Sequence, residues 1–406
     1  MQRESAWPMV SVAEALRVVA EISHTPLGIE MIAPHLAAGR VLAETVHAPA
    51  DMPAERRATV DGYAIRTSDG DGPRQVIAEL TAGSGERIEL APGQATRIMT
   101  GAPLPAGADA AVMVERTQEV AGVLTYHGSV RAGECVLPVG SDMRRDDVVI
   151  PAGATISAGD VGLLTNIGVA WVAVYRRPRV AVLSTGDEVY EYDEPLPYGG
   201  VRDSNRHALM AAIVAAGCEA VSLGIARDDQ ELQRQTIVNG LAQADVLITS
   251  GGVSMGTKDF IKPLLAEIGT VHFGRIAFKP GKPTMCATVG ERIMFGLPGN
   301  PVSSLVSFEV FVRPALRRLQ GDATPERPCV PVSLAHALTP SPDRPEYQRA
   351  IVRWQAGGLV ASTTGAQGSS RLLSMRAANA LLQIAPGHDV LPAGSMVTAV
   401  IIGEIR

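Results

Sequence analysis

The chain has 406 residues, of which 46% are hydrophobic, 19% charged and 4% aromatic. This length and balance predict a globular protein of two to four domains. A net charge of −6 argues against a nucleic-acid partner bound by electrostatics. No run approaches the ~18 apolar residues that would span a membrane, and the N-terminus has no signal-peptide core. We therefore expect no nucleic-acid and no membrane partner.

The four cysteines stand far apart, at positions 135, 218, 286 and 329, and form no CxxC pair. This spacing excludes a zinc ribbon and a redox dithiol, and it is typical of a reducing compartment. A cytoplasmic location is the resulting expectation.

Two helices are predicted within the first 45 residues. Residues 9–22 have the pattern of an amphipathic helix, with Ser11 as N-cap and Glu14 at the capping-box position. Residues 28–37 predict a second helix, ending near Gly39.

Residues 46–145 have a different texture, in which short β-rich runs alternate with Gly/Pro turns. This pattern predicts an all-β module. One of its turns carries an acid, Asp61, and a stiff loop at 99–109 fixes the hydroxyl of Thr100. We expect this acid to be exposed and to have no local partner.

From residue 179 onward, strands alternate with helices. Strands are predicted at 179–184, 219–225 and 245–249, with helices between them. Such spacing predicts parallel βαβ units with right-handed crossovers. Because ligands of these sheets bind at the carboxyl ends of the strands, we expect the site there.

A glycine- and serine-rich loop at 249–256 follows the third strand and precedes a helix. Gly251, Gly252 and Gly256 allow the backbone to turn sharply and to approach a ligand closely. Unpaired N–H groups and the helix dipole predict an anion site. The loop is no ATPase motif, because Thr257-Lys258 reverses the required order of lysine and hydroxyl.

Charged residues cluster beside this loop in the predicted sheet. Acidic groups follow the strands at 185–188 and at Asp228, and Asp259 beside the anion site suits a metal-bridged phosphate. Three cations come next, within 275–283, and then a strand–turn–helix junction at 296–304. Lysines and helix N-termini suit a ligand with more than one phosphate or oxyanion.

After a linker at 321–328, the last segment contains alternating apolar runs that predict a small β-barrel or sandwich. With this segment, the motifs together resemble one family along nearly the whole chain: the molybdopterin molybdenumtransferases, the MoeA-like proteins of molybdenum cofactor synthesis. The stretches that carry the resemblance are 60–64, 100–103, 140–142, 184–188, 203–205, 250–256, 279–283, 297–301, 348–349 and 367–370.

The resemblance implies a multidomain α/β plus β chain that forms a homodimer. Its parts would be an N-terminal helix (1–26) packed on the α/β domain, a mixed linker domain (27–45 and 146–177), a β-rich module (46–145), a parallel-sheet MoaB/MogA-like α/β domain that binds molybdopterin (178–326), and a C-terminal β-barrel (327–406). The β-rich module is expected to reach the α/β domain of the other subunit.

The implied reaction inserts molybdenum from molybdate into adenylylated molybdopterin, with Mg²⁺, and releases AMP. Carried over by position, the catalytic residues would be Asp61, Thr100, Glu188, Asp228, Asp259 and Lys279, of which Glu188, Asp228 and Asp259 would bind the metal. The substrate-binding residues would be Asp142, Ser250, Gly251, Gly252, Ser254, Arg275, Lys282, Pro298, Pro301, Arg349 and Ser370.

The sequence departs from the family pattern at Val60, Arg275 and Asp343. None of these changes removes a charge that the chemistry needs, but they leave the choice between molybdate and tungstate open. The recipient enzymes and the docking of a partner adenylyltransferase stay open as well.

Three alternatives remain. Residues 1–178 and 329–406 argue against a molybdopterin adenylyltransferase, because the small enzymes of that kind lack them. The acidic residues argue against a non-catalytic scaffold that only binds molybdopterin. A molybdate-responsive binding protein is distinguished by whether an AMP-containing product appears.

Overall fold

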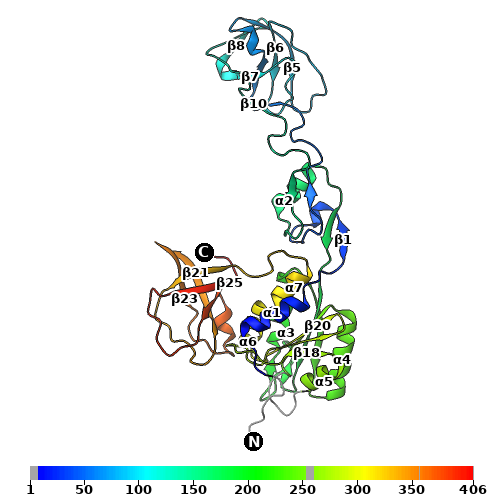
Figure 1. Cartoon of the computed structure of the whole chain (residues 1–406), viewed down its shortest axis with the longest axis vertical. Helices are drawn as coiled ribbons and strands as arrows, with labels where there is room; N and C mark the ends of the chain where they lie inside the picture. Colours follow the sequence, from blue (N-terminus) through cyan, green and yellow to red (C-terminus); the bar gives the residue numbers. More distant parts are fainter. Residues whose placement is uncertain (1–7, 253–259, 356, 406) are drawn as a thin grey trace. The chain divides into compact units, whose positions relative to one another are not determined.

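The computed structural model describes residues 8–252, 260–355 and 357–405 (Figure 1). The chain separates into two compact units. The first comprises Met1–Glu44, Ala152–Val161 and Ala170–Arg406, and the second comprises Thr45–Pro151 and Gly162–Val169. In the described ranges, no helix has the length and apolar character needed to cross a bilayer.

The second unit is built on a six-stranded sheet, as the β-rich texture predicted. The strands lie in the order β7-β4-β6-β5-β9-β8. Their bounds are β4 Gly62–Ile65, β5 Arg74–Leu80, β6 Gln94–Ile98, β7 Ala110–Met113, β8 Thr117–Val120 and β9 Val123–Tyr126. Alternate residues of β4 enter two separate apolar clusters: Tyr63 and Ile65 one, Ala64 the other. The sheet is therefore covered on both faces.

Two short strand pairs complete this unit. β3 (Arg57–Ala58) pairs with β10 (Val136–Leu137), and β2 (Val46–His47) pairs with β11 (Val148–Ile150).

In the first unit, the N-terminal segment differs in part from expectation. Helix α1 (Val12–Ile22) forms as predicted, and the Oγ of Ser11 accepts a hydrogen bond from the Glu14 N–H at 3.1 Å. The predicted helix at 28–37 is wrong. β1 (Ile29–Ile32) pairs there with β12 (Val172–Tyr175), and only a short 3-10 turn follows. Pairing with a segment far along the chain overrides the local helical pattern.

The α/β part of the first unit contains a mixed sheet in the order β16-β13-β17-β20-β19-β18. Its strands are β13 Arg179–Thr185, β16 Glu219–Ala226, β17 Val246–Ser250, β18 Thr270–Phe273, β19 Met285–Val289 and β20 Arg292–Leu297. The first four in the sheet order pair in parallel, as predicted, whereas β18 and β19 run antiparallel. The two residues between β19 and β20 leave room for a hairpin only, because a parallel pair needs a long crossover.

Helices cover both faces of this sheet (Figure 1). They are α3 Ser204–Ala215, α4 Gln230–Gln243, α5 Ile261–Ile268, α6 Pro301–Ser307 and α7 Arg313–Leu319, with a π-helical turn at Phe308–Val312. Val180 and Val182 of β13 pack in the cluster with α1, α3, α6 and α7. The alternate residues Ala181 and Leu183 pack with α4 and α5.

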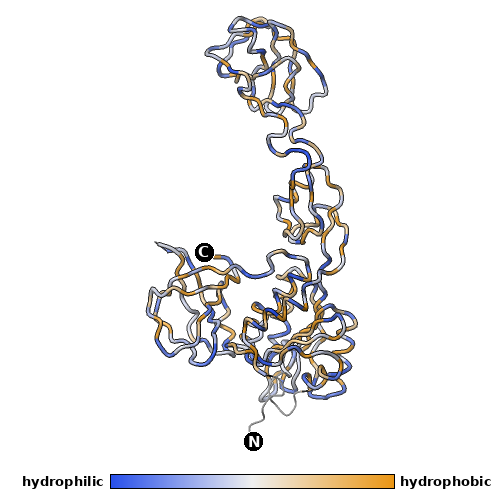
Figure 2. The backbone as a smooth tube through the Cα atoms, viewed as in Figure 1, coloured by the Kyte–Doolittle hydropathy of each residue, from blue (hydrophilic) through white to orange (hydrophobic). Residues whose placement is uncertain are grey.

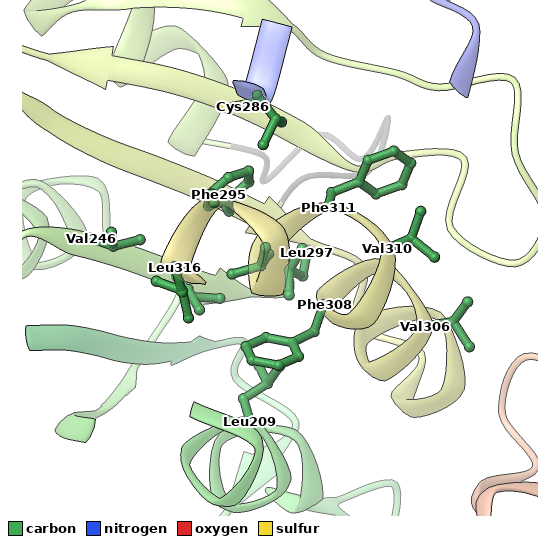
Figure 3. Close-up of a cluster of buried hydrophobic side chains, with 14 of the residues drawn as sticks. Leu209, Val246, Cys286, Phe295, Leu297, Val306, Phe308, Val310, Phe311 and Leu316 are labelled. Atoms are coloured by element: carbon green, nitrogen blue, oxygen red, sulfur yellow. The ribbon is translucent and has the colours of Figure 1, made fainter. Parts of the chain in front are cut away.

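The larger of these clusters is shown in Figure 3. There Phe308 of the π-helical turn lies next to Leu209 of α3, and Phe295 of β20 lies farther away, toward Cys286 of β19. Figure 2 shows the hydrophobic stretches running through this part of the chain. The apolar runs that predicted buried strands thus form a two-sided core.

The C-terminal segment is a closed barrel of strand order β21-β23-β22-β24-β25. Its strands are β21 Cys329–Leu334, β22 Glu346–Gln355, β23 Gly358–Thr363, β24 Ala380–Ile384 and β25 Met396–Ile401. The barrel meets the α/β part along one seam: the Lys279 N–H donates to the Pro345 carbonyl at 3.0 Å, and the Tyr347 N–H donates to the Lys279 carbonyl at 2.8 Å. The ring of Phe278 contacts that of Tyr347.

The amino end of the α/β sheet is fastened by Asp245, which lies just before β17. Its carboxylate, 7% exposed, accepts hydrogen bonds from Arg176 at 2.7 and 2.8 Å and from Arg292 at 2.8 Å. It also accepts one from the Arg179 N–H at 2.9 Å. Burial raises the pKa of Asp245, but hydrogen bonds from Arg176 and the Arg179 N–H outweigh it and hold the pKa below its ordinary value.

We expect Asp245→Asn to destabilise the α/β part by about 2 kcal/mol, lowering its Tm by roughly 4–8 °C at pH 7. A depressed carboxyl pKa stabilises the fold above the unfolded-state value of about 3.9, and this contribution is lost as pH falls through the folded pKa. The Tm difference between wild type and variant should therefore narrow from pH 7 toward pH 3. Thermal unfolding measures it.

The control is Glu219→Gln, which removes a half-exposed carboxylate 3.7 Å from Arg179 at the same end of the sheet. An equal loss of Tm in both variants would show that the buried network has no special role.

Candidate functional site

A cavity of about 720 Å³ opens at the carboxyl ends of the parallel strands, where the sequence predicted the site. It is lined by segments that follow β13, β16, β17 and β20 and by one residue of the barrel. Of the predicted site residues, it contains Glu188, Asp228, Ser250, Gly251, Gly252, Pro298, Pro301 and Ser370.

Gly251 and Gly252 form part of one wall of the cavity, and their backbone leaves little room for side chains. Gly251 and Gly252 have φ angles of 90° and 66°. A Cβ on Gly251 would lie 2.9 Å from the Thr185 carbonyl oxygen, and one on Gly252 would lie 2.6 Å from the Cδ1 of Ile261. The left-handed backbone and this close packing both require glycine. Gly251 and Gly252 therefore present bare backbone to the cavity.

Asn205, at the start of α3, connects two walls of the cavity. Its Nδ2 donates to the Ser250 Oγ and to the Gly299 carbonyl, both at 2.8 Å. The neighbouring Asp203 caps α3 and accepts a hydrogen bond from the Ser184 Oγ at 2.8 Å. Sequence reasoning used 203–205 only as part of a resemblance and did not place these residues in the site. The available signal was an N-cap acid at a strand–helix junction.

Two of the three predicted metal ligands, Glu188 and Asp228, line this cavity. Gly186 has a φ of 135°, a backbone conformation that favours glycine, and a Cβ there would lie 2.6 Å from the Glu188 Oε2 and displace that exposed carboxylate. Within the described residues, no group of three or more His, Cys, Asp or Glu could hold a metal. The third predicted ligand, Asp259, lies outside those residues, as does Ser254. Two carboxylates fit Mg²⁺, which prefers oxygen ligands and commonly takes the rest from phosphates and water.

A second cavity of about 560 Å³ adjoins the first, since Pro283 and Asn300 line both. It lies at the seam with the barrel. Its charged lining residues are Lys279, Lys282, Arg344 and Glu346. The three cations give it a positive balance. Arg275, the remaining cation predicted near this edge, is half-buried and lines neither cavity as the described residues define them.

Arg349 lies buried beneath the wall of the second cavity, with 0% of its surface exposed. Its Nε donates to the Ser374 Oγ at 3.1 Å, and its Nη2 donates to the carbonyl of Gly368, which lines that cavity, at 3.2 Å. Among the described residues, its Nη1 has no hydrogen-bond partner. Burial lowers the pKa of this guanidinium to about 10, which leaves it charged at neutral pH.

Asp61, Thr100 and Asp142 belong to the second unit, whereas both cavities belong to the first. The expectation that Asp61 has no local partner is wrong. Its Oδ1 accepts hydrogen bonds from the Thr100 N–H at 2.7 Å and the Thr100 hydroxyl at 2.8 Å, and these bonds lower the pKa of Asp61. Asp142 is exposed.

Family models match the chain in three consecutive blocks. Residues 10–168 match the MoeA N-terminal region (domain I and II), residues 181–318 a probable molybdopterin binding domain, and residues 331–402 the MoeA C-terminal region (domain IV). Together they contain both cavities and the Asp61–Thr100 pair.

Whole proteins give the same result. The chain is 33% identical to a molybdopterin molybdenumtransferase of Haemophilus influenzae, over 96% of this chain and 98% of that protein. It is 35% identical to a gephyrin of Dictyostelium discoideum, over 100% of this chain and 64% of that protein. The crystal structure of a molybdopterin biosynthesis MoeA protein from Pyrococcus horikoshii superposes with a TM-score of 0.83 at 31% identity, covering 98% of this chain and 100% of that one. The chain belongs to the family of molybdopterin molybdenumtransferases.

Proposed function

We propose that this protein inserts molybdenum from molybdate into adenylylated molybdopterin, releasing AMP and forming the molybdenum cofactor. The observation that carries the proposal is the pair of adjoining cavities. One combines a bare glycine loop with two carboxylates, and the other is lined by cations. A phosphate-rich pterin nucleotide and a dianionic oxyanion need these two kinds of environment, side by side.

The first cavity would hold the pterin nucleotide. The glycine loop and the turn at Pro298 and Pro301 would receive its phosphates, because backbone N–H groups and a helix N-terminus stabilise anions. Glu188 and Asp228, with Asp259, would bind Mg²⁺, which neutralises charge on the phosphoanhydride as it breaks. Ser250 is held in place by Asn205 and would orient the ligand.

The second cavity would take molybdate. Lys279 and Lys282 line it, and Arg349 supplies a further positive charge from beneath the Gly368 wall. Because Arg349 is fully buried, it would act on the anion through its charge and through the Gly368 carbonyl that it holds in the wall. Ser370 lines the first cavity next to Ser369, which lines the second, and would reach the oxyanion where the two cavities adjoin.

The second unit would contribute Asp61, Thr100 and Asp142, in a homodimer whose sites each use both chains. A cytoplasmic location fits the four free cysteines, which are typical of a reducing compartment. Adenylyltransferases and enzymes that accept the cofactor are the partners to test.

The deciding experiment follows AMP release from adenylylated molybdopterin by the purified protein, with and without molybdate and Mg²⁺. We expect release only when both are present. Binding of the nucleotide without any AMP release would favour the alternative of a non-catalytic scaffold. Formation of adenylylated product from ATP and molybdopterin would favour an adenylyltransferase.

Asp228→Asn should reduce Mg²⁺-dependent AMP release by roughly 100-fold while nucleotide binding is retained, because the metal loses an anionic ligand. Asp259→Ala should behave in the same way. The control is Glu231→Gln, which removes an exposed carboxylate in the first turn of α4. Release at the wild-type rate by Asp228→Asn would remove this residue from the mechanism.

Arg349→Ala and Ser370→Ala should each raise the molybdate concentration for half-maximal AMP release, by about tenfold for the charged residue. Nucleotide affinity should stay nearly unchanged in both. Titration of molybdate at saturating nucleotide measures the first quantity, and equilibrium binding measures the second. A large loss of nucleotide affinity would instead assign the two residues to the pterin pocket.

Mixed dimers test the use of two chains in one site. Asp61→Ala and Asp259→Ala homodimers should each be nearly inactive. A mixed dimer, purified through two different tags, should regain AMP release, because one of its two sites receives both wild-type halves. Mixed dimers as inactive as the parents would show that each site is built within one chain.

A further inference from the structure

Among the described residues that line the second cavity, one is a carboxylate, and that carboxylate is already paired. Glu346 starts β22 and is 3% exposed. Its Oε1 lies 3.2 Å from the Nζ of Lys279, whose side chain is 40% exposed. Both residues line the cavity. Lys279, which we propose binds the oxyanion, is therefore already paired with the buried carboxylate of Glu346.

The backbone keeps this pair together. Lys279 and Glu346 face each other in a parallel β-bridge, fixed by hydrogen bonds on both sides of Lys279. This bridge fixes the two backbones beside each other and so keeps the ammonium of Lys279 within reach of the buried carboxylate. An incoming anion must therefore share Lys279 with Glu346 or take it over.

The other cations of the cavity are held differently. Arg344 pairs with Asp343, which is largely exposed, at 3.0 Å. Lys282 is exposed and forms no ion pair with any described residue. The charge of Glu346 also acts on Arg349: burial is the main influence and lowers the pKa of that guanidinium, while Glu346 raises it. Glu346 is thus the buried ion-pair partner of Lys279, and its charge also reaches Arg349.

We propose that Glu346 is a specificity-determining residue of the oxyanion pocket, where it acts as a built-in competitor for Lys279. The proposal rests on the proposed function of this cavity. A buried carboxylate lowers the positive potential that an anion meets. Because Coulomb energy scales with the charge of the ligand, this penalty falls twice as heavily on a dianion as on a monoanion of the same shape. Glu346 therefore limits the affinity for molybdate and for other dianions such as sulfate.

The test compares molybdate, a tetrahedral dianion, with perrhenate, a tetrahedral monoanion, by isothermal titration calorimetry at about 0.1 M ionic strength. Glu346→Gln keeps the size of the side chain and removes its charge. We expect molybdate to bind about tenfold more tightly to this variant and perrhenate about threefold more tightly, since the electrostatic free energies differ by a factor of two. The gain in affinity for sulfate, also a dianion, should match the gain for molybdate.

The matched control is Asp343→Asn, which removes one negative charge beside Arg344 at the mouth of the same cavity. Its effect should be less than about twofold, because exposed ion pairs are weak and screened. In a Lys279→Gln background, the gain from Glu346→Gln should shrink to about half or less on the free-energy scale, because the competition for the lysine is gone.

If Glu346→Gln does not fold, as judged by its Tm, Glu346→Asp replaces it. This variant keeps the charge but withdraws it from Lys279, and molybdate should bind about two- to threefold more tightly. Unchanged or weaker molybdate binding in the folded variant would overturn the inference, as would equal gains for molybdate and perrhenate. Absence of molybdate binding in both wild type and variant would also overturn it. The AMP-release assay separately tests the proposed insertion reaction.

Discussion

The parallel register of three strands is the constraint on which the site depends. Ser184 of β13 pairs with Ser250 of β17, which in turn pairs with Leu297 of β20. All three strands therefore end at one level, and the segments that follow them must turn away at the same edge. Since the backbone groups beyond the last bridge have no strand partner, this edge presents N–H groups and helix starts together. At this edge Gly251 and Gly252 keep the backbone bare, because a Cβ on either would lie within 3.0 Å of an atom of Thr185.

The acidic residues at the two ends of the α/β sheet differ in their surroundings. At the amino end, Asp245 is fully matched by two arginines and a backbone N–H, so that its charge is neutralised inside the fold. At the carboxyl end, Glu188 and Asp228 line open space. A buried charge with complete partners fixes a structure, whereas carboxylates facing a cavity retain the capacity to bind a cation. Burial among its partners distinguishes the structural acid, whereas a place on the cavity wall distinguishes the candidate ligands.

The sequence pattern correctly predicted those elements that depend on interactions between residues close together in the chain. The strands predicted at 179–184, 219–225 and 245–249, the cap at Ser11 and the cavity edge follow from periodicity, capping and topology. The pattern failed at β1, where pairing with β12 decides. The Asp61–Thr100 pair also joins residues far apart in sequence. Such contacts depend on the assembled fold, and no spacing in one sequence encodes them. The burial of Arg349 likewise depends on contacts that form only in the assembled fold.

The seam between the barrel and the α/β part joins the two halves of the second cavity, which we propose binds the oxyanion. Lys279 lies in the α/β part and Glu346 in the barrel, and a backbone bridge aligns them before any ligand arrives. Arg349, three residues along β22, brings its charge from the same strand. The docking that buries the aromatic contact between Phe278 and Tyr347 thus also sets the charge balance of the pocket. Apolar packing fixes how the barrel docks on the α/β part, and this docking sets the distances between the charges in the proposed pocket. A mutation of an apolar residue in the seam would therefore alter anion binding, even though no charged residue is changed.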